Sequence, residues 1–125
     1  MSLQSQPLGS EKVAIIGSGN WGSVVAKIVG NNVSHFKTFN PRVHMWVYEE
    51  VVNKHPLSYW INTHHENVKY LPGVRLPHNV VAEPNLIKAV EDATILVFVL
   101  PHQFIRRACE ELKGHVSSEC KAISL

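Results

Sequence analysis

Residues 13–22 have the sequence VAIIGSGNWG, and this stretch decides the fold of the chain. The four apolar residues at its start form a short continuous run, which is typical of a strand buried on both faces of a parallel sheet. A helix is predicted to follow, because apolar residues continue at helical spacing. The residues expected to face the core are Trp21, Val24, Val25, Ile28 and Val29. The glycines therefore lie between a buried strand and a helix start, where glycine-rich turns bind dinucleotides.

The spacing of the three glycines matches the chemistry of such a turn. Gly17 permits the tight turn, Gly19 lets the backbone approach a pyrophosphate without a Cβ in the way, and Gly22 lets the helix pack closely on the strand. Unpaired N–H groups at the helix start point at the phosphates, whose negative charge the helix dipole favours. The alternative is a strand-to-helix turn with a purely structural role.

The composition predicts one soluble globular domain. The chain has 125 residues, a net charge of +2 and 18% charged residues, so no charge imbalance points to nucleic acid or to an anionic membrane. Only His64 and His65 are adjacent among the eight histidines, and no metal-binding spacing occurs, so no metal site is predicted. Cys109 and Cys120 are isolated thiols, which is typical of a reducing compartment.

Strands and helices alternate along the rest of the chain. Residues 1–11 are expected to form a disordered tail, and they lack the apolar core of a signal peptide. Further strands are predicted at residues 43–48, 80–82, 94–100 and 121–125, with helices at 57–62, 86–90 and 104–112. Asn85 is the expected cap of the helix at 86–90. This alternation predicts an α/β fold with a doubly wound, mainly parallel sheet.

An acidic pair follows the second predicted strand. In dinucleotide-binding folds a carboxylate at this place binds the ribose, usually about 20 residues after the glycine turn. Glu49 stands further along than that, which a longer crossover accommodates, and it is the preferred ribose ligand. Glu50 is the second candidate, and a solvated pair of charges is the third interpretation. Tyr48 is expected to lie against the adenine or only to pack at the strand end.

Ligands of such sheets bind outside the carboxyl ends of the strands. This rule brings residues 17–22, 48–50 and 101–104 to one rim. Phe104 is expected either to face the nicotinamide half of a cofactor or to cap the core. His102 shares the rim, but it has no evident carboxylate partner, so no catalytic role is assigned to it. The long irregular segment 51–78 is either a cover for the cofactor or an insertion.

Five motifs follow one another in a fixed order. They are GSGNWG at 17–22, MWVYEE at 45–50, ENVKYLPG at 66–73, FVLPHQFI at 98–105 and AISL at 122–125. Together they resemble the eukaryotic NAD-dependent glycerol-3-phosphate dehydrogenases, from about Lys12 to Leu125. The resemblance implies a Rossmann-like NAD-binding domain at 12–125, followed in the family by a helical domain. It also implies reversible hydride transfer between NADH and dihydroxyacetone phosphate, giving glycerol 3-phosphate, by a cytoplasmic homodimer.

Carried over position by position, the resemblance implies the cofactor contacts. Glu49 joins this set because it follows the second predicted strand, where a ribose ligand is expected. The predicted cofactor contacts are Gly17, Ser18, Gly19, Asn20, Trp21, Gly22, Tyr48, Glu49 and Phe104. The family usually has phenylalanine where Tyr48 stands. Its substrate-contacting lysine follows the Ile-Ser-Leu motif, and its catalytic lysine lies further on. No catalytic residue is therefore expected within the 125 residues, which resemble an amino-terminal fragment that is inactive alone.

Two alternatives to this function stay open. One is a non-catalytic NAD-binding or regulatory short form. The other is the cofactor domain of a different hydroxyacid or sugar-phosphate dehydrogenase. The Asn-Trp pair inside the glycine loop and the PHQF motif at 101–104 favour the glycerol-3-phosphate dehydrogenase family over that second alternative.

Overall fold

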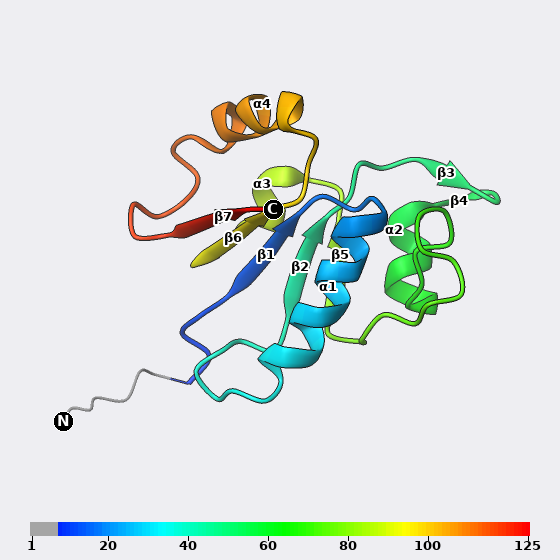
Figure 1. The fold of residues 1–125 in the computed structure, drawn as a ribbon, viewed down its shortest axis with the longest axis horizontal. Helices are drawn as coiled ribbons and strands as arrows, with labels where there is room; N and C mark the ends of the chain where they lie inside the picture. The colour runs from blue at the N-terminus through cyan, green and yellow to red at the C-terminus, as the bar shows by residue number, and fades with distance from the viewer. Residues whose placement is uncertain (1–7) are drawn as a thin grey trace.

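A parallel sheet of five strands forms the centre of residues 8–125, the part of the chain that this computed structural model describes. The strand order is β5-β2-β1-β6-β7, and every neighbouring pair is parallel (Figure 1). The strands are β1 (Val13–Ile16), β2 (Val43–Trp46), β5 (Val80–Glu83), β6 (Ile95–Phe98) and β7 (Lys121–Ser124). The predicted doubly wound α/β fold is confirmed, although β2 and β6 are shorter than predicted.

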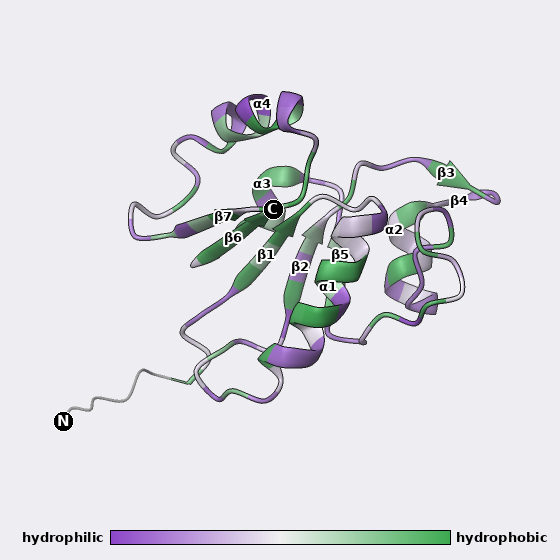
Figure 2. Ribbon diagram, in the orientation of Figure 1, coloured by the Kyte–Doolittle hydropathy of each residue, from purple (hydrophilic) through white to green (hydrophobic). Residues whose placement is uncertain are grey.

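Helices cover both faces of the sheet. On one face lies α1 (Asn20–Val33), together with α2 (Leu57–Tyr59) and the π-helix η1 (Trp60–His64). On the other face lie α3 (Leu86–Ala89) and α4 (His102–Leu112). As predicted, Asn85 caps α3, because its side-chain oxygen accepts a hydrogen bond from the N–H of Lys88 at 3.0 Å. The central strands β1 and β6 are hydrophobic along their length, whereas the outer side of α4 is largely hydrophilic (Figure 2).

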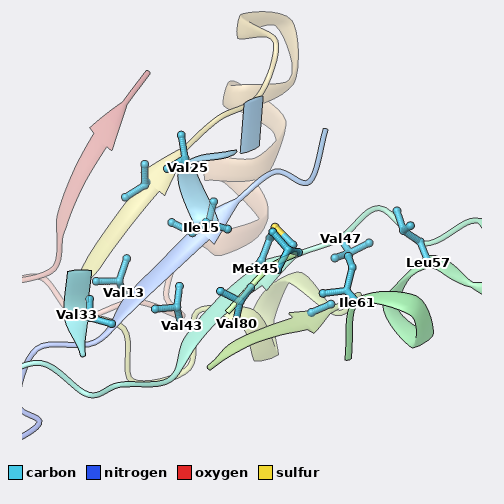
Figure 3. Packing of buried hydrophobic residues seen from close by; sticks show 14 residues of the cluster. Val13, Ile15, Val25, Val33, Val43, Met45, Val47, Leu57, Ile61 and Val80 are labelled. Atoms are coloured by element: carbon cyan, nitrogen blue, oxygen red, sulfur yellow. The ribbon is translucent and has the colours of Figure 1, made fainter. Parts of the chain in front are cut away.

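The central strand β1 supplies side chains to both hydrophobic layers. Val13 and Ile15 pack in the layer under α1, whereas Ala14 and Ile16 pack in the layer under α3 and α4. Figure 3 shows the first layer, where Ile15 and Met45 meet residues of the neighbouring elements. Each fully buried valine or isoleucine contributes about 1.5–3 kcal/mol of transfer free energy. The continuous apolar run at 13–16 thus has the two-sided burial that the sequence predicted.

The face of α1 that packs on the sheet matches the predicted one only in part, since Val25 is buried and Val29 packs against the core. Trp21 and Ile28 are 57% and 52% exposed, so the prediction that they face the core was wrong. The helix instead contacts the sheet through residues that include Gly22, Ala26 and Gly30. A Cβ on Gly30 would lie 2.8 Å from a methyl carbon of Val80, so this contact admits only small residues. Close packing on the sheet, which requires small residues, outweighs the larger apolar side chains.

The segment 51–79 contains structure that the sequence analysis did not predict. Residues 51–56 form a hairpin of β3 (Val51–Val52) and β4 (His55–Pro56), whose turn residues Asn53 and Lys54 have positive φ. The predicted helix at 57–62 is divided between α2 and η1, and Pro56 is the N-cap residue of α2. Residues 66–78 contain only turns and loops, as expected of an irregular segment.

The ordered part of the chain begins earlier than predicted. Residues 1–7 of the predicted tail lie outside the described residues, but Gly9 and Glu11 donate backbone hydrogen bonds to Lys37 and Thr38. Order therefore begins before residue 12. In α4, Phe104 is 51% exposed and Cys109 is exposed, whereas Ala108 and Leu112 are buried against the sheet. Among the described residues, no helix is long and apolar enough to cross a membrane.

Candidate cofactor site

A cavity of about 690 Å³ lies at the carboxyl ends of the central strands. Three of its walls are the segments predicted to share a rim, which follow β1, β2 and β6. The lining residues are Gly17, Ser18, Gly19, Trp46, Tyr48, Glu50, Tyr70, Leu86, Val99, Leu100, Pro101, Phe104, Arg107, Ala108 and Glu111. The structure thus brings the glycine-rich turn, the end of β2 and the start of α4 around one space.

Two glycines of the turn are required by the backbone around them. Gly17 has a φ of +133°, and a Cβ there would lie 2.3 Å from the carbonyl oxygen of Val99. A Cβ on Gly22 would lie 2.5 Å from the carbonyl oxygen of Gly17. Both distances are far below van der Waals contact, so any side chain at either position would displace β6 or α1. These two glycines therefore maintain the fold of the turn.

Gly19 differs from them, because its missing side chain leaves open space. A Cβ built on Gly19 meets no atom within 4 Å, and Gly19 lines the cavity. It is also the N-cap of α1, with no side-chain capping bond and no acidic residue in the first helical turn. The first N–H groups of a helix have no partner within the helix, and the helix dipole places partial positive charge there. These features fit a phosphate group that approaches the backbone at Gly19.

The two glutamates after β2 have different surroundings. The carboxylate of Glu49 accepts hydrogen bonds from the N–H of Ser58 at 3.0 Å and from its hydroxyl at 2.5 Å. Glu50 lines the cavity, forms an ion pair with Lys69 and accepts a hydrogen bond from the hydroxyl of Tyr70 at 2.6 Å. The bond from Lys69, and then that from Tyr70, lower the pKa of Glu50. Glu50 is therefore a carboxylate at neutral pH, at the wall where a ribose ligand was expected.

Some predicted site residues line the cavity and others do not. Gly17, Ser18, Gly19, Tyr48 and Phe104 are part of the lining. The other predicted contacts are not part of the lining: Asn20, Trp21, Gly22 and Glu49. His102 is exposed and is not part of the lining.

Three polar lining residues were not predicted from the sequence, and two of them were recoverable. Arg107 and Glu111 follow Phe104 on α4 by three and seven positions. Residues at such spacing share a helix face, so the placement of Phe104 on the rim carried the signal for both. Tyr70 reaches the cavity from a loop and gave no periodic signal. The described residues contain no cluster of three or more metal-ligating side chains.

Comparison with known proteins identifies the family. The profile of the NAD-dependent glycerol-3-phosphate dehydrogenase N-terminus matches residues 12–125. The chain belongs to this family. The resemblance stated from the five motifs is thereby confirmed, and the family's cofactor is NAD.

Individual glycerol-3-phosphate dehydrogenases show how far the similarity extends. The cytoplasmic NAD(+) enzyme of Homo sapiens is 57% identical over 118 residues, which are 94% of this chain and 34% of the human protein. The solved structure of the Saccharomyces cerevisiae enzyme is 54% identical, with a TM-score of 0.88 over 91% of this chain and 33% of that chain. The Plasmodium falciparum enzyme is 40% identical, with a TM-score of 0.86 over 93% of this chain and 32% of its own. The chain spans about a third of the length of these relatives.

Proposed function

We propose that the cavity binds NAD and that the chain forms the cofactor domain of an enzyme that transfers a hydride between NADH and dihydroxyacetone phosphate, giving glycerol 3-phosphate. The observation that carries this proposal is the open space at Gly19, where an added Cβ would meet no atom within 4 Å, at the start of α1. A pyrophosphate fits there because helix N–H groups and the helix dipole favour an anion.

The proposed contacts of the adenosine half come from residues after β2. Glu50 is a carboxylate in the cavity wall, so we assign the ribose hydroxyls to Glu50 in preference to Glu49. Tyr48 supplies an aromatic face for the adenine, and it is 73% exposed, so its hydroxyl reaches water. Phe104, which lines the cavity from α4, is assigned to the nicotinamide half. Asn20, Trp21 and Gly22 support the phosphates through the backbone of the first turn of α1.

The cofactor accepts or supplies the hydride when it is bound. Reduction of a ketone also requires a group that stabilises the developing alkoxide and donates a proton. We propose that this group belongs to the part of the relatives' length that the present chain does not match. The longer enzyme is proposed to be a cytoplasmic homodimer, a location supported by the name of the human relative.

Calorimetric titration of the 125-residue chain with NADH tests the cofactor assignment. We expect saturable binding with one site per chain, competed by ADP-ribose, which retains the pyrophosphate. Absence of saturable binding up to about 1 mM NADH, equivalent to a free energy weaker than about −4 kcal/mol, would contradict the assignment. Far-UV circular dichroism of the same sample establishes that the protein is folded.

A further inference from the structure

A loop that is distant in sequence forms hydrogen bonds with the glycine-rich turn. This loop, residues 66–73, lies between η1 and β5. We propose that Asn67 in this loop is a positioning residue for cofactor binding, which fixes the direction of the Gly19 N–H without touching the cofactor. The inference rests on the proposed function, because it presumes that a pyrophosphate binds at Gly19.

The side chain of Asn67 is fully buried, with an exposed fraction of 0%. Its Nδ2 donates to the carbonyl oxygen of Ser18 at 2.8 Å and to the hydroxyl oxygen of Ser23 at 2.8 Å. Its Oδ1 accepts a hydrogen bond from the backbone N–H of Tyr70 at 2.9 Å. One amide group thus joins the glycine-rich turn, the first turn of α1 and the loop that carries Asn67 itself.

The bond to Ser18 determines where the next N–H points. The peptide group between Ser18 and Gly19 is planar and trans, so its carbonyl and its N–H point in opposite directions. Because Asn67 holds the carbonyl oxygen, the Gly19 N–H points away from Asn67. Glycine permits backbone conformations that other residues do not, so a peptide next to Gly19 rotates more easily than most. Asn67 restricts that rotation and thereby pre-organises a phosphate-binding donor.

A second contact ties the same loop to both sides of the cavity. Asn20, the first residue of α1, donates from Nδ2 to the carbonyl oxygen of Tyr70 at 2.9 Å. The hydroxyl of Tyr70 in turn donates to Glu50 at the other wall. The loop therefore sets the position of the turn relative to the carboxylate assigned to the ribose. The segment 51–78 was expected to be a cover for the cofactor or an insertion. In this proposal its residues 66–73 instead support the glycine-rich turn.

Asn62 provides a matched control for a merely structural asparagine. Its Nδ2 donates to the carbonyl oxygen of Ala82 at 3.1 Å, and its Oδ1 accepts from the N–H of Ala82 at 2.8 Å. Like Asn67, it joins its own element to a neighbouring one through side-chain hydrogen bonds, here η1 to β5, although Asn62 is exposed. It does not line the cavity and does not bond to the glycine-rich turn. Loss of either asparagine removes hydrogen bonds, but only loss of Asn67 releases the turn.

The experiment compares Asn67→Ala and Asn62→Ala with two ligands, ADP-ribose and AMP, by calorimetry. ADP-ribose carries the pyrophosphate, whereas AMP carries the adenosine with one phosphate. We expect Asn67→Ala to weaken ADP-ribose binding by about tenfold or more, which is about 1.4 kcal/mol, and AMP binding by less than about threefold. Asn62→Ala should change both affinities by less than about twofold, even if it lowers the melting temperature as much.

Several results would overturn the positioning role. One is an Asn67→Ala variant that is folded and binds ADP-ribose as the parent chain does. Another is an equal loss for ADP-ribose and AMP, or the same loss in Asn62→Ala. If Asn67→Ala does not fold, Asn67→Asp decides, because it keeps the size of the side chain and the acceptor for the Tyr70 N–H but removes the donor to the Ser18 carbonyl oxygen. A folded Asn67→Asp variant with unchanged affinity for ADP-ribose then refutes the role. A parent chain that binds neither ligand would refute the proposed function instead.

Discussion

The substitution Gly19→Val separates cofactor binding from folding. The backbone at Gly19 has φ −72° and ψ −165°, an extended conformation that valine adopts without strain. No atom lies within 4 Å of the added Cβ, so the variant should fold. Valine is a poorer N-cap than glycine, but it also lowers the entropy of the unfolded chain, and these opposing effects are each about 1 kcal/mol or less. The melting temperature should therefore shift by less than about 5 °C.

Binding should change far more than stability. The two methyl groups of valine would occupy space assigned to the pyrophosphate, and forcing groups together in this way costs about 1–3 kcal/mol. The displaced phosphate would also lose a hydrogen bond between charged and polar groups, worth about 1.5–3 kcal/mol. The sum is at least about 2.5 kcal/mol, so affinity for NADH should fall by roughly 70-fold or more.

The assay pairs calorimetric titration with thermal unfolding, and Gly22→Val is the matched comparison. Its Cβ would lie 2.5 Å from the carbonyl oxygen of Gly17, so Gly22→Val should lower the melting temperature strongly. Gly19→Val should instead retain the melting temperature and lose NADH. A folded Gly19→Val variant that binds NADH with the parent affinity would show that the pyrophosphate does not lie at Gly19.

The remaining predictions concern cofactor choice, turnover and pH. Glu50→Gln should reduce the preference for NADH over NADPH by about tenfold, because the 2′-phosphate of NADPH then meets the released Lys69 instead of a carboxylate. Glu49→Gln should leave the ratio of the two dissociation constants unchanged, because Glu49 is bonded to Ser58. An unchanged ratio in Glu50→Gln would assign the discrimination elsewhere. The 125-residue chain should not reduce dihydroxyacetone phosphate in a steady-state absorbance assay, and turnover by purified chain would place the proton donor within it. Burial, and then the charge of Lys12, lower the pKa of His44 in the folded chain, so protonation of His44 favours the unfolded chain. The free energy of unfolding should therefore fall as the pH drops below about 6.5, until His44 is also protonated in the folded state. Urea unfolding at several pH values should show a flatter dependence for His44→Gln, and an identical dependence would exclude His44 as a contributor.

The features that the sequence predicted correctly depend on neighbouring residues. The strand at 13–16 and the glycine-rich turn after it are local patterns, since burial on both faces and the need for a phosphate-binding turn act on adjacent positions. Alternating strands and helices then leave few topologies for the sheet. For this reason the fold, and the shared rim at the carboxyl ends of the strands, could be predicted.

The features that the sequence did not predict depend on contacts between distant residues. Trp21 and Ile28 fit a helical stripe, but the periodicity does not show that Gly30 must approach Val80. The sequence could not decide between the two glutamates at 49 and 50 for a related reason. The alternation of buried and less buried side chains along β2 ends with the strand at Trp46. It therefore cannot predict the direction of side chains in the irregular segment that follows. The contacts that set the direction of the two carboxylates come from residues 58 and 70, further along the chain.

The two-sided burial of β1 has a consequence for how the molecule unfolds. Ile15 and Ile16 are adjacent in sequence, yet each belongs to a different hydrophobic layer. Neither layer can lose its share of β1 while the other keeps it, because one backbone carries both. Loosening on the α1 side is therefore transmitted to the α3 and α4 side, and the two layers melt in a single cooperative transition. The strand that ends in the glycine-rich turn thus makes the cofactor site and the core one thermodynamic unit.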